Sequence, residues 1–460
     1  MQPTLKTVSF FIAVLLIVNQ SVASDWGFKD VGEGIKPAVA VDSNNVPHVS
    51  FVIESGTGGV FHAKLDKSFG VFRIDTVSQG YFYGPADIEI DNMSNPHVSY
   101  HDHALNGGDL AHLAYNGSSW DVLPVFSSGH DGWDSEIAFD SKNYTHIVSI
   151  DAPVGMPGSG MEYAVYDGVQ WTVEPLNTSI NIYYGYGLGF QIDQNDVPHV
   201  SYYDDQEKHL YYANRSTGSW VLNKIDSMGD AGRYSTMVVD DMNVVHLCYL
   251  KTLPGDSAVI QYNYLSGGTW TLTSLDTVVG ISSAARKVIS LQMSTSGKLH
   301  IVYGTTEKIV YLEQMSTGWK KEVIYNAKDD GVVLGEGIRF KLDKLDDAHV
   351  VFYQGAANDI GWKVKYLSNA DDIVESGGEK NATLNIQVYP NPFYSCFEIK
   401  GISEKSLVQI FNDLGQSIYT TMVSNSQFSV DLSEVGGGFY FVKVIGLISN
   451  DQHYFKLLKK

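Results

Sequence analysis

The sequence predicts an all-β protein: a seven-bladed β-propeller followed by a small β-sandwich domain. Three observations lead to this fold. A unit of roughly 50 residues that ends in His-Val-Ser-Tyr, or a close variant, recurs seven times. An aromatic residue, usually tryptophan, follows nearly every repeat histidine at a similar distance. Beyond the repeats, a polar segment precedes a second set of alternating strands. The predicted boundaries are 1–24 for a signal peptide, 25–368 for the propeller, 369–384 for a linker and 385–460 for the sandwich.

The N-terminal segment has the composition of a secretory signal peptide. Lys6 precedes an apolar run from Phe10 to Val18, and small residues follow before Asp25. The apolar run is too short to span a membrane, and no later run reaches the necessary length. We therefore expect an exported protein without a membrane span.

Composition and charge narrow the classes of function. The 460 residues include 44 glycines and 28 tyrosines but only 18% charged residues, which favours turn-rich β-structure. The formal net charge of −21 argues against nucleic acid as a partner. It argues less against an acidic polysaccharide, because the few arginines can still be placed locally. The two cysteines fall in different predicted domains, so we expect no disulfide framework.

Each repeat combines an alternating apolar strand, an Asp/Asn turn and the strand that contains the histidine. The periods of 47 to 54 residues hold about four short strands each, which fits a radial array of four-stranded blades. Because the histidine occurs in every copy, we expect a shared packing or hydrogen-bonding role rather than metal binding or catalysis. The turn residues are those that tight hairpins need, with calcium binding as the alternative. The repeat histidines are His48, His97, His146, His199, His246, His300 and His349.

The seventh repeat lacks its fourth strand where the chain order would place it. Trp362 belongs to the third strand of this copy, and the chain turns polar after Tyr366. Trp26 lies 22 residues before His48, where the tryptophan strand of a preceding blade is expected. We therefore predict that the strand near Trp26 completes blade seven and closes the ring, which removes an exposed sheet edge.

The segment after the linker resembles the type IX secretion sorting domain. The motifs that carry the resemblance are YPNPF at 389–393, DLG at 413–415, GFY at 438–440 and the basic end at 456–460. The resemblance implies passage across the outer membrane by the type IX secretion machinery and a secreted or cell-surface location. An unrelated sandwich used for adhesion is the alternative.

One residue per blade opens the innermost strand and so surrounds the mouth of the central channel. A purely structural rim would repeat one small or apolar residue type, but the seven residues here differ, which favours a binding or catalytic face. The loops that leave the second strands emerge on the same face, because those strands run antiparallel to the first. The predicted rim residues are Ile35, Gly84, Trp133, Tyr186, Arg233, Lys287 and Glu336.

Histidines, tyrosines and cations from blades two to five are expected to converge on this face. Most come from the segments YHDH (100–103), GHDGWD (129–134) and YYGYG (183–187). For each single histidine, a hydrogen-bonded loop residue is the alternative. The candidate catalytic residues are His101, His103, His112, His130, Tyr184, Tyr186, Arg233 and Tyr249. The candidate substrate-binding residues are Trp133, Lys251 and Lys287.

This set suits β-elimination on a uronic acid better than glycoside hydrolysis, because no carboxylate pair is evident. Arg233 would neutralise the uronate carboxylate, and one of the candidate histidines, such as His130, would remove the C5 proton. A candidate tyrosine would then protonate the leaving oxygen. This chemistry requires no cofactor. We assign no metal ligands, and the sequence leaves open whether the protein binds a structural metal ion. The sequence contains no nucleophile elbow of the Ser-His-Asp class and no sialidase repeat.

The propeller region resembles seven-bladed polysaccharide lyases, notably ulvan lyases, in its repeat and in the segments YHDH, GHDGWD and YGYG. The resemblance implies a secreted lyase that cleaves an acidic polysaccharide containing uronic acid. The alternative is a non-catalytic surface lectin or adhesin, in which Trp133, Tyr184 and Tyr186 stack on sugar rings.

Overall fold

A computed structural model describes most of the chain from residue 26 onward. The signal segment, the linker from 371 and several loops lie outside the described residues. The described ranges are 26–54, 58–79, 86–102, 109–125, 132–151, 160–177, 182, 187–279, 288–335, 337–355, 361–370, 386–402, 405–413, 416–446 and 452–460.

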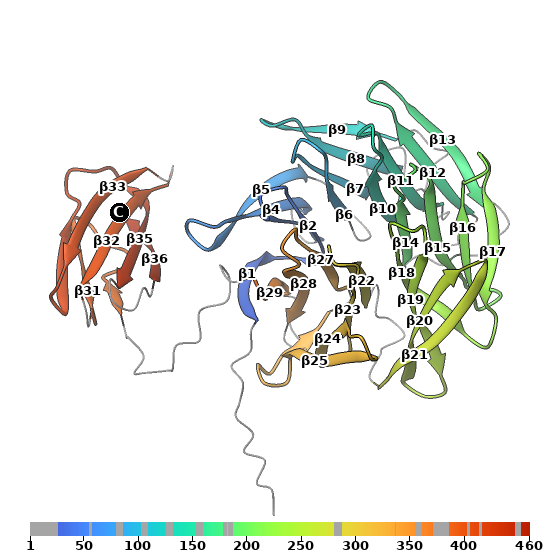
Figure 1. The fold of residues 1–460 in the computed structure, drawn as a ribbon. Coiled ribbons are helices and arrows are strands. Elements are labelled where there is room, and N and C mark those ends of the chain that lie inside the picture. Colours follow the sequence, from blue (N-terminus) through green and yellow to red (C-terminus); the bar gives the residue numbers. More distant parts are fainter. Residues whose placement is uncertain are drawn as a thin grey trace, which may run out of the picture. The chain divides into compact units, whose positions relative to one another are not determined.

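Blades one to six are antiparallel four-stranded sheets whose strands follow chain order. Figure 1 shows the sheets arranged radially, with the first strand of each blade innermost. Blades one to three are β2 (Ile35–Val41), β3 (Pro47–Ile53), β4 (Gly59–Asp66), β5 (Val71–Gln79); β6 (Asp87–Ile90), β7 (Pro96–Asp102), β8 (Asp109–Tyr115), β9 (Trp120–Pro124); and β10 (Trp133–Phe139), β11 (Thr145–Asp151), β12 (Gly160–Tyr166), β13 (Trp171–Asn177). Blades four to six are β14 (Leu188–Ile192), β15 (Pro198–Asp204), β16 (His209–Asn214), β17 (Val221–Asp226); β18 (Ala231–Val239), β19 (Val245–Leu253), β20 (Ser257–Ser266), β21 (Thr269–Val279); and β22 (Ile289–Met293), β23 (Leu299–Gly304), β24 (Lys308–Gln314), β25 (Trp319–Asn326).

Blade seven joins the two ends of the propeller. Its first three strands are β27 (Arg339–Leu342), β28 (Ala348–Gly355) and β29 (Lys363–Ser368), and the short β26 (Val333–Leu334) also pairs with β28. The fourth strand is β1 (Gly27–Glu33), which pairs with β29 so that Lys29 lies opposite Tyr366. The predicted ring closure by the N-terminal strand is therefore confirmed.

A chain of three aromatic side chains links each blade to the next. The repeat histidine hydrogen-bonds through Nδ1 to a tyrosine or histidine on the third strand of its own blade, at 2.5–2.9 Å. That ring meets an aromatic ring of the next blade edge-on, with centroids 5.2–5.7 Å apart. The edge-on pairs are His62–Trp120, His112–Trp171, Tyr163–Trp220, Tyr212–Trp270, Tyr262–Trp319, Tyr311–Trp26 and Tyr366–Phe72. Trp26 thus supplies the tryptophan of blade seven.

The repeat histidine also contacts the aspartate of its turn. In every blade except the sixth, which has Ser294 there, the histidine Nε2 lies 3.3–3.6 Å from the aspartate carboxylate. In blade one this carboxylate, from Asp42, also accepts hydrogen bonds from the backbone of Asn44 and Val46 at 2.9 Å. Burial lowers the pKa of the repeat histidine in blades one to six. These neutral rings have the shared packing role that the repeat predicted.

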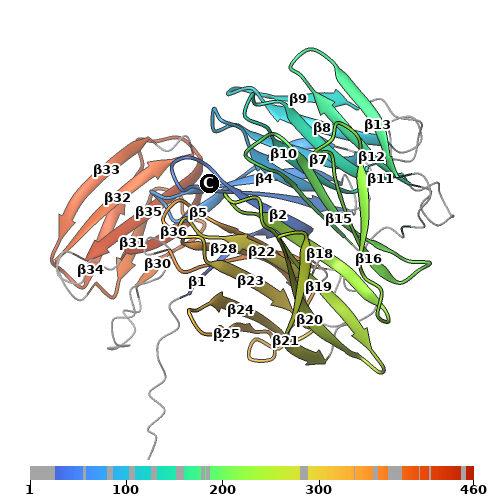
Figure 2. The same cartoon turned by 45° about the vertical axis from the view of Figure 1, so that its right-hand side comes forward.

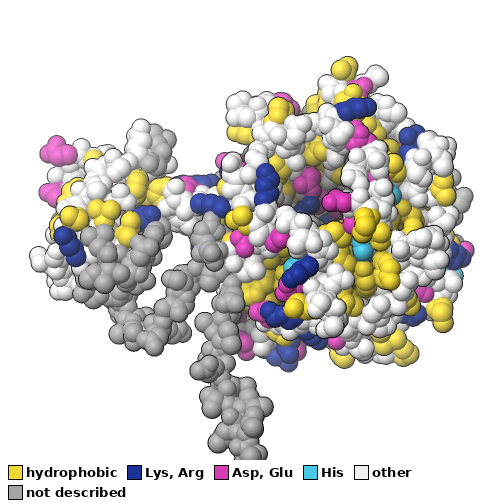
Figure 3. Space-filling view, in the orientation of Figure 1, with side chains coloured by type: hydrophobic (Ala, Val, Ile, Leu, Met, Phe, Trp, Pro, Cys, Tyr) yellow, Lys and Arg dark blue, Asp and Glu magenta, His cyan; other side chains and the backbone are white. Residues whose placement is uncertain are grey.

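Charged side chains from opposite sides of the ring meet at its centre. Arg339 of blade seven donates to Glu136 of blade three at 3.0 Å, and Lys341 donates to Glu89 of blade two at 2.6 Å. These four residues line a cavity of about 360 Å³. Figure 3 shows acidic side chains at the hollow in the middle of the ring. Ion pairs between non-adjacent blades therefore connect the ring across its channel.

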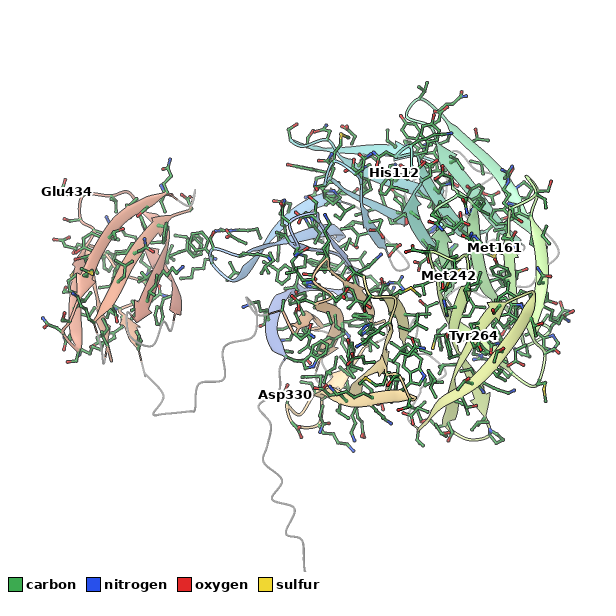
Figure 4. The ribbon with its side chains drawn as sticks, viewed as in Figure 1. His112, Met161, Met242, Tyr264, Asp330 and Glu434 are labelled. Carbon is green, nitrogen blue, oxygen red and sulfur yellow. The ribbon has the colours of Figure 1, made fainter. Side chains whose placement is uncertain are left out.

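Replacing Trp26 by alanine is expected to destabilise the propeller by about 3 kcal/mol or more, the usual cost of removing a buried tryptophan. The side chain is 8% exposed and packs edge-on against Tyr311 at 5.2 Å. Chemical denaturation followed by fluorescence measures the change. Met242→Ala is the control, because Met242, labelled in Figure 4, is 80% exposed. A Trp26→Ala protein as stable as the control would contradict the closure.

The C-terminal unit is a two-sheet sandwich. The strands β30, β31 and β34 form one sheet, and β33, β32, β35 and β36 form the other; Figure 2 shows both. Apolar residues of both sheets, such as Phe397 and Val442, share one core. The strands are β30 (Gln387–Tyr389), β31 (Cys396–Lys400), β32 (Ser406–Asn412), β33 (Ser417–Val423), β34 (Gln427–Asp431), β35 (Gly438–Gly446) and β36 (Gln452–Lys459).

The YPNPF segment fastens the last strand of the sandwich. The side chain of Asn391 donates to the carbonyl of Lys456 and accepts from the N–H of Leu458, both at 2.9 Å. Phe393 is fully buried in the core and accepts a hydrogen bond from the backbone of Lys460.

Among the residues that the structure describes, no helix has the length and hydrophobicity needed to cross a membrane.

Candidate functional site

In blades one, three and five, the innermost strand opens on a β-bulge. In each of these blades the residue that follows the predicted rim residue has a left-handed backbone conformation. The φ angle is 53° at Lys36, 49° at Asp134 and 57° at Tyr234. The pairing with the second strand changes register at the same place. A bulge bends its strand and redirects the side chains beside it. The side chains placed at these bulges are those of Ile35, Trp133 and Arg233.

Glycine lets two of these strands begin close against the preceding blade. A Cβ at Gly132 would lie 2.8 Å from the Cα of Leu110, and one at Gly232 would lie 2.8 Å from the Cα of Leu210. Both glycines also have positive φ, 90° and 122°, which larger residues rarely adopt. The rim of blade three therefore abuts blade two, and the rim of blade five abuts blade four.

His101 and Trp133 form a stacked pair at the boundary between blades two and three. Their ring centroids are 4.3 Å apart and their planes differ by 24°. His101, near the end of β7, is buried, whereas Trp133 at the start of β10 is half-buried. On the same strand end, Tyr100 donates a hydrogen bond to Asp102 at 3.1 Å. Two predicted site residues therefore meet, and His101 supports the indole ring at the start of the innermost strand of blade three.

Arg233 belongs to a network between blades four and five. Its guanidinium donates to both carboxylate oxygens of Asp230, at 3.2 and 3.1 Å, and lies 5.3 Å from the ring centre of Tyr203. The hydroxyl of Tyr203 donates to Asp230 at 2.6 Å. Burial, and then the hydrogen bond to Asp230, raises the pKa of Tyr203 far above its usual range. Arg233 is thereby fixed at the rim with its charge balanced by a carboxylate.

Tyr249 and Lys251 converge on Asp226, at the end of blade four. The hydroxyl of Tyr249 donates to Asp226 at 2.9 Å and accepts from Asn263 at 3.2 Å. The Nζ of Lys251 lies 3.8 Å from the same carboxylate. Tyr249 is fully buried, and burial, followed by Asp226, raises its pKa far above the usual range. This phenol is suited to holding the strand ends together rather than to protonating a bound polymer.

His112, labelled in Figure 4, is buried where blade two meets blade three. Its Nε2 is 2.9 Å from the Nδ1 of His97, and its ring meets Trp171 edge-on. This is the position that tyrosines occupy in blades three to seven, so the structure gives His112 a packing role. Burial, and then the neighbouring His97, lowers its pKa well below the usual value. Five other predicted site residues lie outside the described residues: His103, His130, Tyr184, Tyr186 and Lys287.

A group of carboxyls between blades two and three was not anticipated from the sequence. Burial raises the pKa of Glu162 on β12, and the neighbouring carboxylates Asp151 and Asp109 raise it further. The one available signal was an acidic residue that interrupts the apolar strand at 160–166. Glu162 can therefore keep a proton to higher pH than an ordinary glutamate, as a general acid must. Within the described ranges, no three or more His, Cys, Asp or Glu side chains are grouped to hold a metal ion.

Sequence comparison identifies the C-terminal domain. Residues 387–457 match the family of secretion system C-terminal sorting domains, which agrees with the resemblance seen in the motifs. No protein of curated function matches the chain.

Structural comparison shows the propeller fold. An ulvan lyase of polysaccharide lyase family PL25 has a TM-score of 0.52 at 13% identity, covering 74% of this chain and 94% of the lyase. Its structure bound to -[GlcA(1-4)Rha3S]- gives 0.51 and 14% over the same shares. A fungal alcohol oxidase of the AA5 family, in complex with copper, gives 0.50 and 10%, covering 94% of this chain and 99% of the oxidase. At these identities the likeness concerns the fold alone. The sorting domain, in turn, makes this chain a secreted or cell-surface protein.

Proposed function

We propose that the rim of blades two to five binds a polysaccharide, with Trp133 as the principal contact. The observation that supports this proposal is the half-buried indole of Trp133 at the start of the innermost strand of blade three, held by the bulge, by Gly132 and by the stack on His101. Flat aromatic rings pack against the C–H faces of sugars, while a few polar groups around them bind hydroxyls and fix orientation. Asp102 and Arg233 are polar groups of this kind on the same face.

The proposed ligand is an acidic polysaccharide that contains uronic acid. The fold is shared with an ulvan lyase whose structure holds a glucuronate-containing oligosaccharide, and a secreted protein encounters such polymers outside the cell. At the rim, Arg233 and Lys251 each lie beside an aspartate. A uronate carboxylate would compete with Asp230 for the guanidinium of Arg233, which binds carboxylates through two parallel N–H donors.

Replacing Trp133 by alanine is expected to weaken polysaccharide binding about fivefold to 150-fold, because the loss of one stacking surface costs roughly 1–3 kcal/mol. Affinity electrophoresis of the purified protein in gels that contain ulvan, alginate or pectate measures the change. Trp133→Phe is expected to retain most of the binding, since it keeps an aromatic face.

The matched control is Trp171→Ala. Trp171 is also a half-buried tryptophan of blade three, but it begins the outermost strand and packs against His112. Its loss is expected to reduce stability and leave binding unchanged. Binding that falls equally in both variants, or in neither, would contradict a rim site centred on Trp133.

A second candidate function is β-elimination of the bound uronate polymer. The observation that favours it is Arg233, whose guanidinium is fixed at the rim and can neutralise the carboxylate next to the C5 proton. The candidate base is His101 or one of His103 and His130. His112 is set aside as the base and Tyr249 as the acid, because both have buried structural contacts. The acid would then be Tyr184 or Tyr186, and Glu162 is a further candidate for the acid. If the protein binds these polymers saturably but forms no unsaturated product, it functions as a lectin.

A further inference from the structure

A separate cavity lies between blades one and two, away from the rim face. Its volume is about 380 Å³, within the range of cavities that hold one small ligand. The third and fourth strands of blade one form one wall, and residues near the second and third strands of blade two form the other. The lining residues used below are His62, Lys64, Asp66, Arg73, Asp75 and Tyr115.

A relay of hydrogen bonds fixes the state of His62. The carboxylate of Asp42, whose pKa the hydrogen bond to His48 and two backbone N–H groups lower despite burial, lies 3.5 Å from Nε2 of His48. A proton on that nitrogen leaves Nδ1 of His48 as an acceptor, so Nε2 of His62 donates to it at 2.9 Å. Nδ1 of His62 is then an acceptor. It has no hydrogen-bond partner among the described residues, although His62 is only 5% exposed.

Blade one differs from the other blades at this place. Blades three to seven have a tyrosine where blade one has His62, and its hydroxyl satisfies the repeat histidine. Blade two repeats the histidine relay with His97 and His112. It has Ala114 and Asp121, however, at the paired positions that Lys64 and Arg73 occupy in blade one. The Nδ1 of His112 is also without a hydrogen-bond partner among the described residues, so the charged strand pair and the cavity beside it are what distinguish blade one from blade two.

The charges in the cavity favour an uncharged ligand. The Nζ of Lys64 lies 3.4 Å from Asp42, and Arg73 lies 3.1 Å from Asp66. Asp75, which pairs with His62 across the strands, adds a third carboxylate to these two cations. An excess of negative charge disfavours sulfate and carboxylate groups, whereas carboxylates, a guanidinium and a free imidazole acceptor suit the hydroxyls of a sugar.

We propose that this cavity binds one neutral sugar residue, with His62 Nδ1 accepting a hydrogen bond from a hydroxyl and with Asp75 and Arg73 binding its neighbours. This site is independent of the polysaccharide site on the rim. A second contact on the same chain would also raise the retention of the protein on a polysaccharide that carries neutral sugars.

The test is His62→Tyr in the mature full-length protein. A tyrosine at this position reproduces the arrangement of blades three to seven, in which its hydroxyl bonds to the repeat histidine, so the protein should fold. The substitution removes the imidazole Nδ1 acceptor and puts a larger ring beside the cavity. Saturation-transfer NMR and calorimetry would use methyl glycosides of rhamnose, fucose, galactose, glucose and xylose, with glucuronate as the anionic counterpart. At least one neutral glycoside is expected to bind, and His62→Tyr is expected to weaken it more than tenfold.

Two controls separate this site from the rim. His112→Tyr makes the same change in blade two and is expected to leave glycoside binding unchanged. Asp75→Asn leaves the cavity open and is expected to weaken binding less than His62→Tyr does. The proposal fails if no neutral glycoside binds, if glucuronate binds better than all of them, or if binding survives His62→Tyr and is lost in Trp133→Ala. If only polysaccharide binding at the rim is lost, the proposal for this cavity is unaffected.

Discussion

Removing residues 386–460 is expected to leave a folded propeller that no longer reaches the cell surface. The matched sorting family covers 387–457, and this unit has its own core of buried residues from two sheets. The propeller keeps all seven blades in such a truncation, because β1 and β29 already close the ring. Fractionation of cells that produce the full-length and truncated chains, with protease digestion of intact cells, measures surface delivery.

The folding of the truncated chain requires its own measurement. Its thermal unfolding midpoint is expected to match that of the propeller transition in the full-length protein, since each unit has a separate core. A truncated chain that is folded but retained inside the cell supports the assignment. A truncated chain that appears on the surface at the normal level would show that residues 386–460 do not direct sorting.

The structure also explains the asparagine of the YPNPF motif. The side chain of Asn391 bonds to the strand β36 on both its donor and acceptor sides. The sequence motif predicted a sorting domain, but it gave no physical reason for the asparagine. The structure supplies one, because the two hydrogen bonds fasten the last strand against the segment that opens the domain.

The ring was predictable because its information is repeated along the chain. The spacing of the repeat histidines defines the blade length, and a single missing tryptophan strand pointed to Trp26 at the other end. In the structure Trp26 meets Tyr311 with the same edge-on geometry as the other blade contacts. Each repeat thus contributes the same buried layer, and a deviation in one copy is visible against the other six.

The candidate site was less predictable because it depends on contacts between blades. The sequence singled out Arg233 but not Asp230 or Tyr203, whose contacts with it depend on the packing of blade four against blade five. It also grouped His112 with the rim histidines because they are near neighbours along the chain. Whether a ring points into the layer between blades or towards the mouth depends on strand register, which a short segment does not define.

The strongest chemical test is the expected effect of Arg233→Ala on β-elimination. Abstraction of the C5 proton places negative charge on the carboxylate and the adjacent carbon, and a fixed guanidinium lowers the energy of that state. Removing one such group typically costs about a hundredfold to a thousandfold in kcat. We therefore expect kcat/KM on ulvan or another uronate polymer to fall at least about a hundredfold, measured by the ultraviolet absorbance of the unsaturated product.

Two further variants decide whether the loss of activity in Arg233→Ala arises in the elimination step. Arg215→Ala removes an arginine that pairs with Glu174 at 2.7 Å beyond the end of β16, on the face opposite the rim. It is expected to leave activity unchanged. Arg233→Lys keeps the positive charge but not the two parallel hydrogen bonds to Asp230, so partial activity with normal thermal unfolding is expected. If the wild-type protein binds uronate polymers and yields no absorbance on any of them, the rim is a binding site without elimination chemistry. If Arg233→Ala cleaves as fast as wild type, another cation neutralises the carboxylate.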